Sequence, residues 1–365
     1  MSTQNPPQGG FCYVKLNHPK KGAKRVIPML RNIGVLNEFL QLFFIGLTML
    51  RIRAQSSLIL RCKFKKSYYT RGNPMELRTD IALEAAEAVE RIKLSEQDLM
   101  KRVRVEGDIQ VTRMVVQSDR AAQLLGKPAG TYITVEVPPL SDNERESEPH
   151  ARVIAEELNS LLPQEGTVLV VGLGNANITP DALGPQAAGL VLATRHIQGE
   201  FARSMGLDDL RATAVCKPGV LGQTGVESGE LTAGLCRTVK PGAVIVIDAL
   251  ASRSLERLGC TVQLCDNGIS PGSGVGNNRT AIDRELLGVP VIGIGVPMVV
   301  DARTIAVELT GGDGGEMVTP RGSAMMVTPR EIDLMVRRAA QLVAMAINIA
   351  LQPNYSPQEM MTAAM

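Results

Sequence analysis

The chain has 365 residues, 44% of them hydrophobic, which is enough for one large domain or two smaller ones with a sizeable core. Tryptophan is absent and aromatic residues make up 3%, which argues against a base-stacking surface for nucleic acid. The six cysteines show no CxxC pair and no regular spacing, so we expect reduced thiols in a cytosolic protein, not a disulfide framework.

The net charge of +2 is the sum of a strongly basic front segment and an acidic remainder. Residues 1–66 contain twelve Lys or Arg and one acid, Glu38, so their net charge is +11 and that of residues 67–365 is −9. The apolar run 39–50 is too short to span a bilayer and lacks the context of a signal peptide. Three interpretations stay open: a basic interfacial arm, an unusual targeting segment, or a start assigned too early, with the protein beginning near Met75. The abrupt change in composition favours the last.

From residue 75 onward, helical and strand patterns alternate. Residues 79–92 have a cap-like Thr or Asp before Ala, Leu and Glu, which favours a helix. Further helices are predicted to end near Leu162, to begin near Leu183, and to cover 252–258 and 329–351. Strands are predicted at 109–116, 130–137, 167–172, 243–248, 261–265 and 290–295. This order predicts an α/β fold: a mostly parallel or mixed sheet with helices on both faces, plus small additional β elements.

The stretch VLVVGLGNANITPDALGP begins like a nucleotide-binding turn and then departs from that pattern. Gly172 and Gly174 follow a predicted strand, but Asn177 stands where a third glycine would complete a dinucleotide fingerprint. Asp181 lies in this loop, and Asp248 is at the end of the strand predicted at 243–248. Because such sheets bind ligands beyond the carboxyl ends of their strands, we expect both aspartates at one edge.

Two neighbouring carboxylates leaving apolar strands have a specific chemistry. Burial and mutual repulsion raise a pKa, so one keeps its proton while the other acts as a base, and the pair can activate a water between them. This predicts peptide hydrolysis without a metal or other cofactor. The alternative is that each aspartate only caps a helix, Asp181 before ALGP and Asp248 before ALASRS.

Other chemistries fit the sequence less well. It has no HExxH and its three histidines are scattered, which disfavours a zinc site. Pro271 replaces the first glycine of a GxSxG elbow, and no GK[ST] follows the Gly-rich run, which excludes a P-loop. We expect that run, with Ser273 and Gly274, to form turns and site walls. Lys217 and Arg253 are candidates for holding a substrate carboxylate, unless they are simply solvated.

Several long stretches resemble, in the same order, the germination protease family of spore-forming bacteria. They cover about residues 76–350 and are RTDIALEA, VVGLGNANITPDALGP, TRH, KPGVLGQTGVES, VIDALASRSLER, DNGISPGSGVGNNR, LGVPVIGIGVPMVVDA and MVTPREID. The resemblance implies a phosphorylase/hydrolase-like fold and an aspartic endopeptidase that degrades small acid-soluble spore proteins during germination. Asp181 and Asp248 take the catalytic positions, and Asn175 and Asp266, in the same stretches, are further candidates for the site wall.

The resemblance also implies how the chain is made and where it acts. Such proteins are homotetrameric zymogens that cleave themselves, here between Asp80 and Ile81. Residues 1–74 are then an atypical basic extension, 75–80 a short propeptide and 81–365 a single peptidase domain. The expected location is the cytoplasm of the developing forespore and the spore core, with small acid-soluble spore proteins and other copies of the chain as partners, and with no nucleic acid or membrane.

Two alternatives stay open. The first is a metal-dependent maturation peptidase of the hydrogenase-processing type, whose members resemble this fold, with Asp181, Asp248 and Asp266 as metal ligands. The second is a non-catalytic sensor that binds a nucleotide or anion through the Gly-rich loops. Sensitivity to chelators would separate the first alternative from an aspartic peptidase, and nucleotide binding would test the second.

Overall fold

The structure, a computed structural model, describes most of the chain after residue 78. The described residues are 12–15, 26–29, 79–89, 94–141, 147–197, 199–272, 279–310, 318, 322, 325–357 and 359–360. Residue contacts divide the chain into two units, Met1–Pro74 and Met75–Met365. In the first unit, β1 (Cys12–Lys15) pairs antiparallel with β2 (Val26–Met29). The apolar run 39–50, Ser273 and Gly274 lie outside the described residues.

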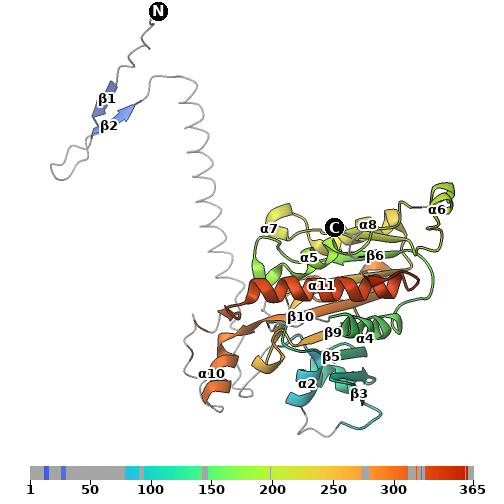
Figure 1. Cartoon of the computed structure of the whole chain (residues 1–365). Coiled ribbons are helices and arrows are strands. Elements are labelled where there is room, and N and C mark those ends of the chain that lie inside the picture. The colour runs from blue at the N-terminus through green and yellow to red at the C-terminus, as the bar shows by residue number, and fades with distance from the viewer. Residues whose placement is uncertain are drawn as a thin grey trace, which may run out of the picture. The chain divides into compact units, whose positions relative to one another are not determined.

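In the described part of the second unit, nine strands form one mixed sheet (Figure 1). The strands are β3 (Leu99–Glu106), β4 (Ile109–Val116), β5 (Gly130–Glu136), β6 (Val168–Gly172), β7 (Thr213–Cys216), β8 (Ala243–Ser252), β9 (Thr261–Cys265), β10 (Val291–Asp301) and β11 (Met326–Val327). Their order is β3-β4-β5-β9-β10-β8-β6-β7, with β11 against the end of β10. Strands β10, β8, β6 and β7 are parallel, whereas β9, β5, β4 and β3 pair antiparallel. The prediction of an α/β fold with a mixed sheet is confirmed.

Helices cover both faces of the sheet because its apolar side chains alternate. Val168 and Val170 of β6 belong to one core, with helices α4 (Glu148–Asn159), α5 (Leu183–Gly189) and α11 (Ile332–Leu351). Leu169 and Val171 belong to the opposite core, which includes residues of α8 (Ser228–Val239) and α9 (Arg284–Leu287). Helices α2 (Ala82–Ala88) and α3 (Asp119–Leu125) cover the antiparallel half with a third cluster.

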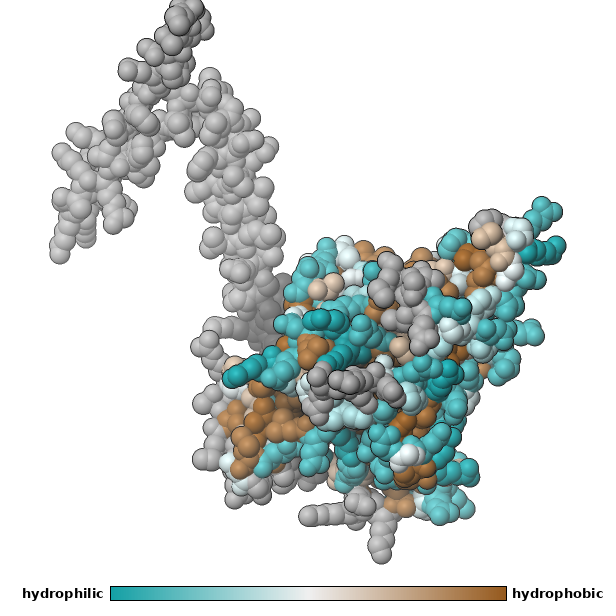
Figure 2. Space-filling view, in the orientation of Figure 1, coloured by the Kyte–Doolittle hydropathy of each residue, from teal (hydrophilic) through white to brown (hydrophobic). Residues whose placement is uncertain are grey.

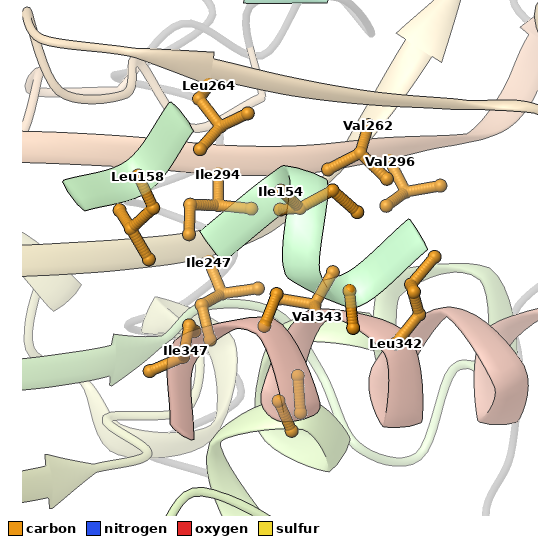
Figure 3. Close-up of a cluster of buried hydrophobic side chains, with 14 of the residues drawn as sticks. Ile154, Leu158, Ile247, Val262, Leu264, Ile294, Val296, Leu342, Val343 and Ile347 are labelled. Atoms are coloured by element: carbon orange, nitrogen blue, oxygen red, sulfur yellow. The ribbon is translucent and has the colours of Figure 1, made fainter. Parts of the chain in front are cut away.

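Helix α11 is the most apolar of the described helices that cover the sheet. By length and composition it could cross a membrane, but most of it is buried inside the protein. Figure 3 shows Val343 and Ile347 of α11 in one cluster with Ile247 of β8 and Ile154 of α4. The apolar character of α11 is therefore used in packing against the sheet and α4.

The remaining described helices are short. They are α6 (Gly199–Met205), α7 (Leu221–Thr224), α10 (Ala302–Thr310) and the two 3₁₀ helices η1 (Thr179–Asp181) and η2 (Leu255–Arg257). In the view of Figure 2 hydrophobic residues gather where α10 lies, on a surface that is otherwise mixed with many hydrophilic residues. Leu309 of α10 is 77% exposed, so its side chain contributes nothing to the core.

The helix-cap alternative for the two aspartates is wrong. Asp248 lies in the middle of β8, because this strand continues to pair with β10 as far as Ser252, across an irregularity at Pro297. The helix predicted at 252–258 is only η2, whose cap is the Ser254 hydroxyl. Asp181 is the last residue of η1, and α5 begins after it without a side-chain cap.

Candidate active site

Glycines allow the loop after β6 to fold back over the sheet edge. A Cβ on Gly184 would lie 2.2 Å from the carbonyl oxygen of Leu173 and 2.5 Å from that of Ile247, so α5 can start against the strands only with glycine there. Gly174 has a φ of +113°, and a Cβ on it would lie 1.9 Å from the Asp181 carbonyl oxygen. These glycines therefore serve close packing around Asp181.

The carboxyl group of Asp181 is fixed by the same loop. Its Oδ2 accepts a hydrogen bond from the backbone N–H of Asn175 at 2.7 Å. Burial raises the pKa of Asp181, and the Asn175 N–H and the charge of Arg279 oppose that rise. The side chain is thus held in one position while its proton affinity is increased.

Asp248 is the more deeply buried acid. Its residue is 7% exposed, and its Oδ1 accepts a hydrogen bond from the Ala249 N–H at 2.9 Å. Burial raises its pKa well above the ordinary value, and the charges of Asp181 and Asp80 raise it further. We call Asp181 and Asp248 the carboxylate pair. Because the charge of Asp181 disfavours ionisation of Asp248, the buried Asp248 carboxyl group holds a proton more tightly than an isolated, solvated carboxyl group would.

The carboxylate pair lines a cavity of about 670 Å³. Its wall includes a third acid, Asp80, the cation-bearing side chains Lys127 and Arg279, and the amide of Gln263. The described part of the Gly-rich loop, residues 268–272, also lines it. The cavity therefore combines an acid pair with hydrogen-bond donors, which suits the polarisation of a carbonyl group and the activation of water.

Asp80 lies along β8 like a short added strand. Its backbone N–H donates to the Ala251 carbonyl oxygen at 3.0 Å, and its Oδ2 accepts from the Ala251 N–H at 2.8 Å. Its carbonyl oxygen accepts from Lys127 Nζ and Gln263 Nε2, both at 3.0 Å. Ile81 is fully buried at the start of α2. The bond predicted for self-cleavage is therefore anchored on both sides at the cavity wall.

Glu84 ties this segment to the far end of β8. It is 2% exposed and accepts hydrogen bonds from the N–H groups of Arg253, at 2.6 Å, and Ser254, at 3.1 Å. Burial raises its pKa, and these bonds, with those from Thr79 and the charge of Arg257, oppose the rise. The sequence suggested only a helix-forming residue here, because its partners are about 170 residues away in the chain.

Four other predicted site-wall residues do not line the cavity. Among the described residues, the cavity wall does not include Asn175, Lys217, Arg253 or Asp266. Asn175 contributes its backbone N–H to Asp181, while its side-chain oxygen accepts from Gln223 at 2.7 Å. The N–H of Arg253 binds Glu84, so this residue positions the end of β8.

The metal-site alternative lacks a converging ligand set in the part of the chain that the structure describes. There, no group of three or more His, Cys, Asp or Glu side chains is placed to hold a metal ion. The Asp266 carboxylate instead accepts a hydrogen bond from the Thr131 N–H of β5 at 2.8 Å. This contact is exposed and lies just after the end of β9. Asp266 is therefore not a partner of the carboxylate pair.

Lys127, Gln263 and Arg279 are the site residues that the sequence did not single out. Lys127 follows the αL glycine that ends α3, and Gln263 is a polar residue inside the predicted strand 261–265. Arg279 closes the Gly-rich loop, its N–H donating to the Pro271 carbonyl oxygen at 3.3 Å. Of these three residues, Gln263 alone carried a signal in the sequence, because a polar side chain within an apolar strand can indicate a functional site.

Fold and site together define an α/β protein with a cavity lined by the acids Asp80, Asp181 and Asp248. The family model for germination protease matches residues 76–310. A germination protease of Caldanaerobacter subterraneus subsp. tengcongensis is 42% identical over 318 residues, covering 78% of this chain and 97% of that protein. One of Clostridium perfringens is 39% identical over 312 residues, covering 76% and 96%. The chain therefore belongs to the germination protease family and is a peptidase, as its sequence patterns predicted.

Two more distant comparisons complete this picture. A germination protease of Priestia megaterium is 34% identical over 347 residues, covering 75% of this chain and 93% of that protein. Among solved structures, a [NiFe] hydrogenase maturation protease, HycI, of Thermococcus kodakarensis has a TM-score of 0.31 and 17% identity, covering 52% of this chain and 98% of that chain.

Proposed function

We propose that this peptidase is of the aspartic type and uses the carboxylate pair to activate a water molecule. The observation that carries the proposal is the burial of Asp248 in mid-strand, beside the charge of Asp181, in a cavity where a segment of peptide already lies along β8. A carboxyl group placed there with no chemical role would only cost stability, because burial penalises its ionised form.

The mechanism follows from the shared proton. Near neutral pH one member of the pair is ionised and accepts a proton from water, while the other is protonated and donates to the leaving nitrogen. Asp248, whose pKa is raised more strongly, is the member that keeps its proton in the resting state, and Asp181, held by the Asn175 N–H, is the ionised member that accepts a proton from water. After cleavage, transfer of a proton from Asp181 to Asp248 restores the resting state.

The edge of β8 is suited to an extended substrate. The Asp80 N–H donates to the Ala251 carbonyl oxygen, and the Ala251 N–H donates to the Asp80 carboxylate, which supports the proposal that a strand of substrate adds there. The Ala251 N–H donates to the carboxylate of an acidic side chain, as it does to Asp80, and this favours Asp before the cleaved bond. Small acid-soluble spore proteins, cleaved in the spore core during germination, are the substrates that family membership suggests.

The same membership suggests the biosynthetic form. We propose that the chain is made as a homotetrameric zymogen and cleaves itself between Asp80 and Ile81. The contacts of Asp80 within the cavity support this, because the bond is already presented next to the carboxylate pair. The forespore cytoplasm is the proposed place of synthesis.

One incubation tests the function. The full-length protein is mixed with a purified small acid-soluble spore protein, and the fragments are sequenced at both ends. We expect a few defined cuts, with acidic residues before the cleaved bonds, and no cuts with Asp181→Asn. Cleavage that continues in this variant, or no cleavage by the unaltered protein after its own processing, would contradict the proposal.

A further inference from the structure

The carbonyl group of Asp80 is bound by two side chains from different parts of the chain. Lys127 Nζ donates to this oxygen at 3.0 Å and to the Thr79 carbonyl oxygen at 3.2 Å. Gln263 Nε2 donates to the Asp80 oxygen at 3.0 Å. Lys127 and Gln263 line the same cavity as the carboxylate pair. A single backbone carbonyl therefore receives one charged and one neutral donor at the site of the proposed chemistry.

The amide of Gln263 is held in one orientation. Its Oε1 accepts from the Ala82 N–H at 2.6 Å, so its Nε2 must face the Asp80 carbonyl oxygen. Gln263 is 6% exposed and lies within β9, where its backbone is paired with Gly295 of β10 and Thr134 of β5. The donor is thus preorganised by the sheet, and it spans the peptide bond between Asp80 and Ile81.

Lys127 is equally constrained. It follows Gly126, the left-handed cap of α3, and its backbone N–H donates to the Ala122 carbonyl oxygen at 3.1 Å. Burial lowers its pKa, while the charges of Asp80 and Glu84 act in the opposite direction and favour the ammonium form. A half-buried ammonium directed at a carbonyl oxygen in a cavity interacts more strongly with developing negative charge than it would in water.

Building on the proposed aspartic mechanism, we propose that Lys127 and Gln263 form an oxyanion site for the peptide carbonyl group. They would act first on the Asp80–Ile81 bond and then on a substrate strand that takes the same place along β8. Both are catalytic residues in this proposal, because they contact the oxygen on which charge develops.

The reaction step balances as follows. The water oxygen bonds to the carbonyl carbon while one water proton passes to the ionised member of the carboxylate pair. The electron pair of the C=O bond moves onto the oxygen held by Lys127 and Gln263. When the oxyanion collapses, the C–N bond breaks and the nitrogen takes the proton of the other carboxyl group, which leaves an acid and an amine.

Two substitutions in the full-length chain separate this role from substrate binding. Lys127→Met removes the cation, and Gln263→Glu removes the donor while keeping an acceptor for the Ala82 N–H. We expect each to lower kcat on a small acid-soluble spore protein by about 10²–10³-fold, the usual loss for one oxyanion donor, with KM within about threefold of the unaltered value. Lys127→Arg should recover part of kcat. The matched control, Lys101→Met on the exposed strand β3, should leave both constants unchanged.

The outcomes also distinguish this proposal from the proposed function. Asp181→Asn is measured in parallel: if it remains active, the aspartic mechanism itself fails. If it is inactive while Lys127→Met keeps its kcat, or shows only a raised KM, the oxyanion site is refuted and Lys127 is merely an anchor for the segment. Thermal unfolding is recorded for each variant, and if Lys127→Met does not fold, Gln263→Glu and Lys127→Arg decide the question by the same split between kcat and KM.

Discussion

Replacing Asp248 by Asn tests the buried carboxyl group of β8 as a catalyst. The residue is 7% exposed, and an amide of the same size keeps its packing but cannot take up or release a proton. A general acid or base contributes about 10²–10⁴-fold to the rate. We therefore expect kcat on a spore protein to fall by at least about 10²-fold, while the protein still folds and assembles.

The same substitution should change how the free energy of unfolding depends on pH. In the unfolded chain Asp248 ionises near the ordinary pKa of about 3.9, whereas burial and the charges of Asp181 and Asp80 raise its pKa in the folded protein. Between these two pKa values the folded protein binds more protons, so the unaltered protein loses stability as the pH rises through that window. Each unit of pKa elevation corresponds to about 1.4 kcal/mol. Asp248→Asn removes this loss and should be more stable than the unaltered protein at neutral pH.

Thermal unfolding between about pH 4 and pH 8 measures this difference. Both chains are compared before any cleavage at Asp80, and the gain in Tm should grow with pH by roughly 2–4 °C per kcal/mol. Asp266→Asn is the matched control, because its carboxylate is bound to the Thr131 N–H at an exposed position. A variant that is less stable than the unaltered protein at neutral pH would refute burial as the cause of the raised pKa, and an undiminished kcat would remove Asp248 from the mechanism.

Three further predictions concern the same site. The mature N-terminus should be Ile81, formed only when the carboxylate pair is intact, and Asp80→Lys should slow this cleavage. Terminal sequencing checks both expectations. A different N-terminal residue, or Ile81 as the N-terminus of a purified variant that lacks Asp181 or Asp248, would contradict them. Gly174→Ala should cost about 1–3 kcal/mol in chemical unfolding and abolish cleavage, because its Cβ would lie 1.9 Å from the Asp181 carbonyl oxygen, whereas Gly107→Ala, with open space around it, should keep its activity. Exhaustive chelation should leave cleavage undiminished; activity that is lost and then restored by zinc or nickel would favour a metal-dependent peptidase.

The pattern of the sequence was sufficient for the fold class and for the meeting of the two aspartates. Both aspartates follow apolar runs, which predicts that they meet at one edge of the sheet, and in the structure the charge of Asp181 raises the pKa of Asp248. The predicted strand 243–248 ends too early, because an acid in an apolar run is typical of a strand end. The continuation of β8 depends on pairing with residues of β10 that lie about 48 positions further along the chain, and such a distant partner leaves no local signal in the sequence.

The first strand of the sheet, β3, was not predicted because it is highly charged and exposed to solvent. Strand β3 has the sequence LMKRVRVE, and most of its side chains are exposed. Its four charged residues leave only Val103 and Val105 as an alternating apolar pair, which is too short a pattern to predict a strand. The direction of β9 was also not predicted, because its pairing with β5 and β10 joins segments distant in sequence. Lys127 and Gln263 could not be predicted for the same reason. Their proposed role depends on contacts with a segment distant in sequence, and their sequence neighbours are those of an ordinary turn and an ordinary strand.

The short chain of hydrogen bonds around Thr79 has a consequence for the cleaved protein. The Ile81 N–H donates to Thr79 Oγ1 at 3.0 Å, and this hydroxyl donates to the buried carboxylate of Glu84. A cut before Ile81 turns that neutral N–H into an ammonium group, and departure of Thr79 leaves it facing Glu84 without an intermediary. Glu84, whose Oε1 already lies 3.8 Å from Arg257 Nη1, would then gain a second counter-ion, and through the N–H groups of Arg253 and Ser254 it would hold the end of β8 more firmly than before. Proteolysis would in this way exchange a covalent tether for an internal ion pair.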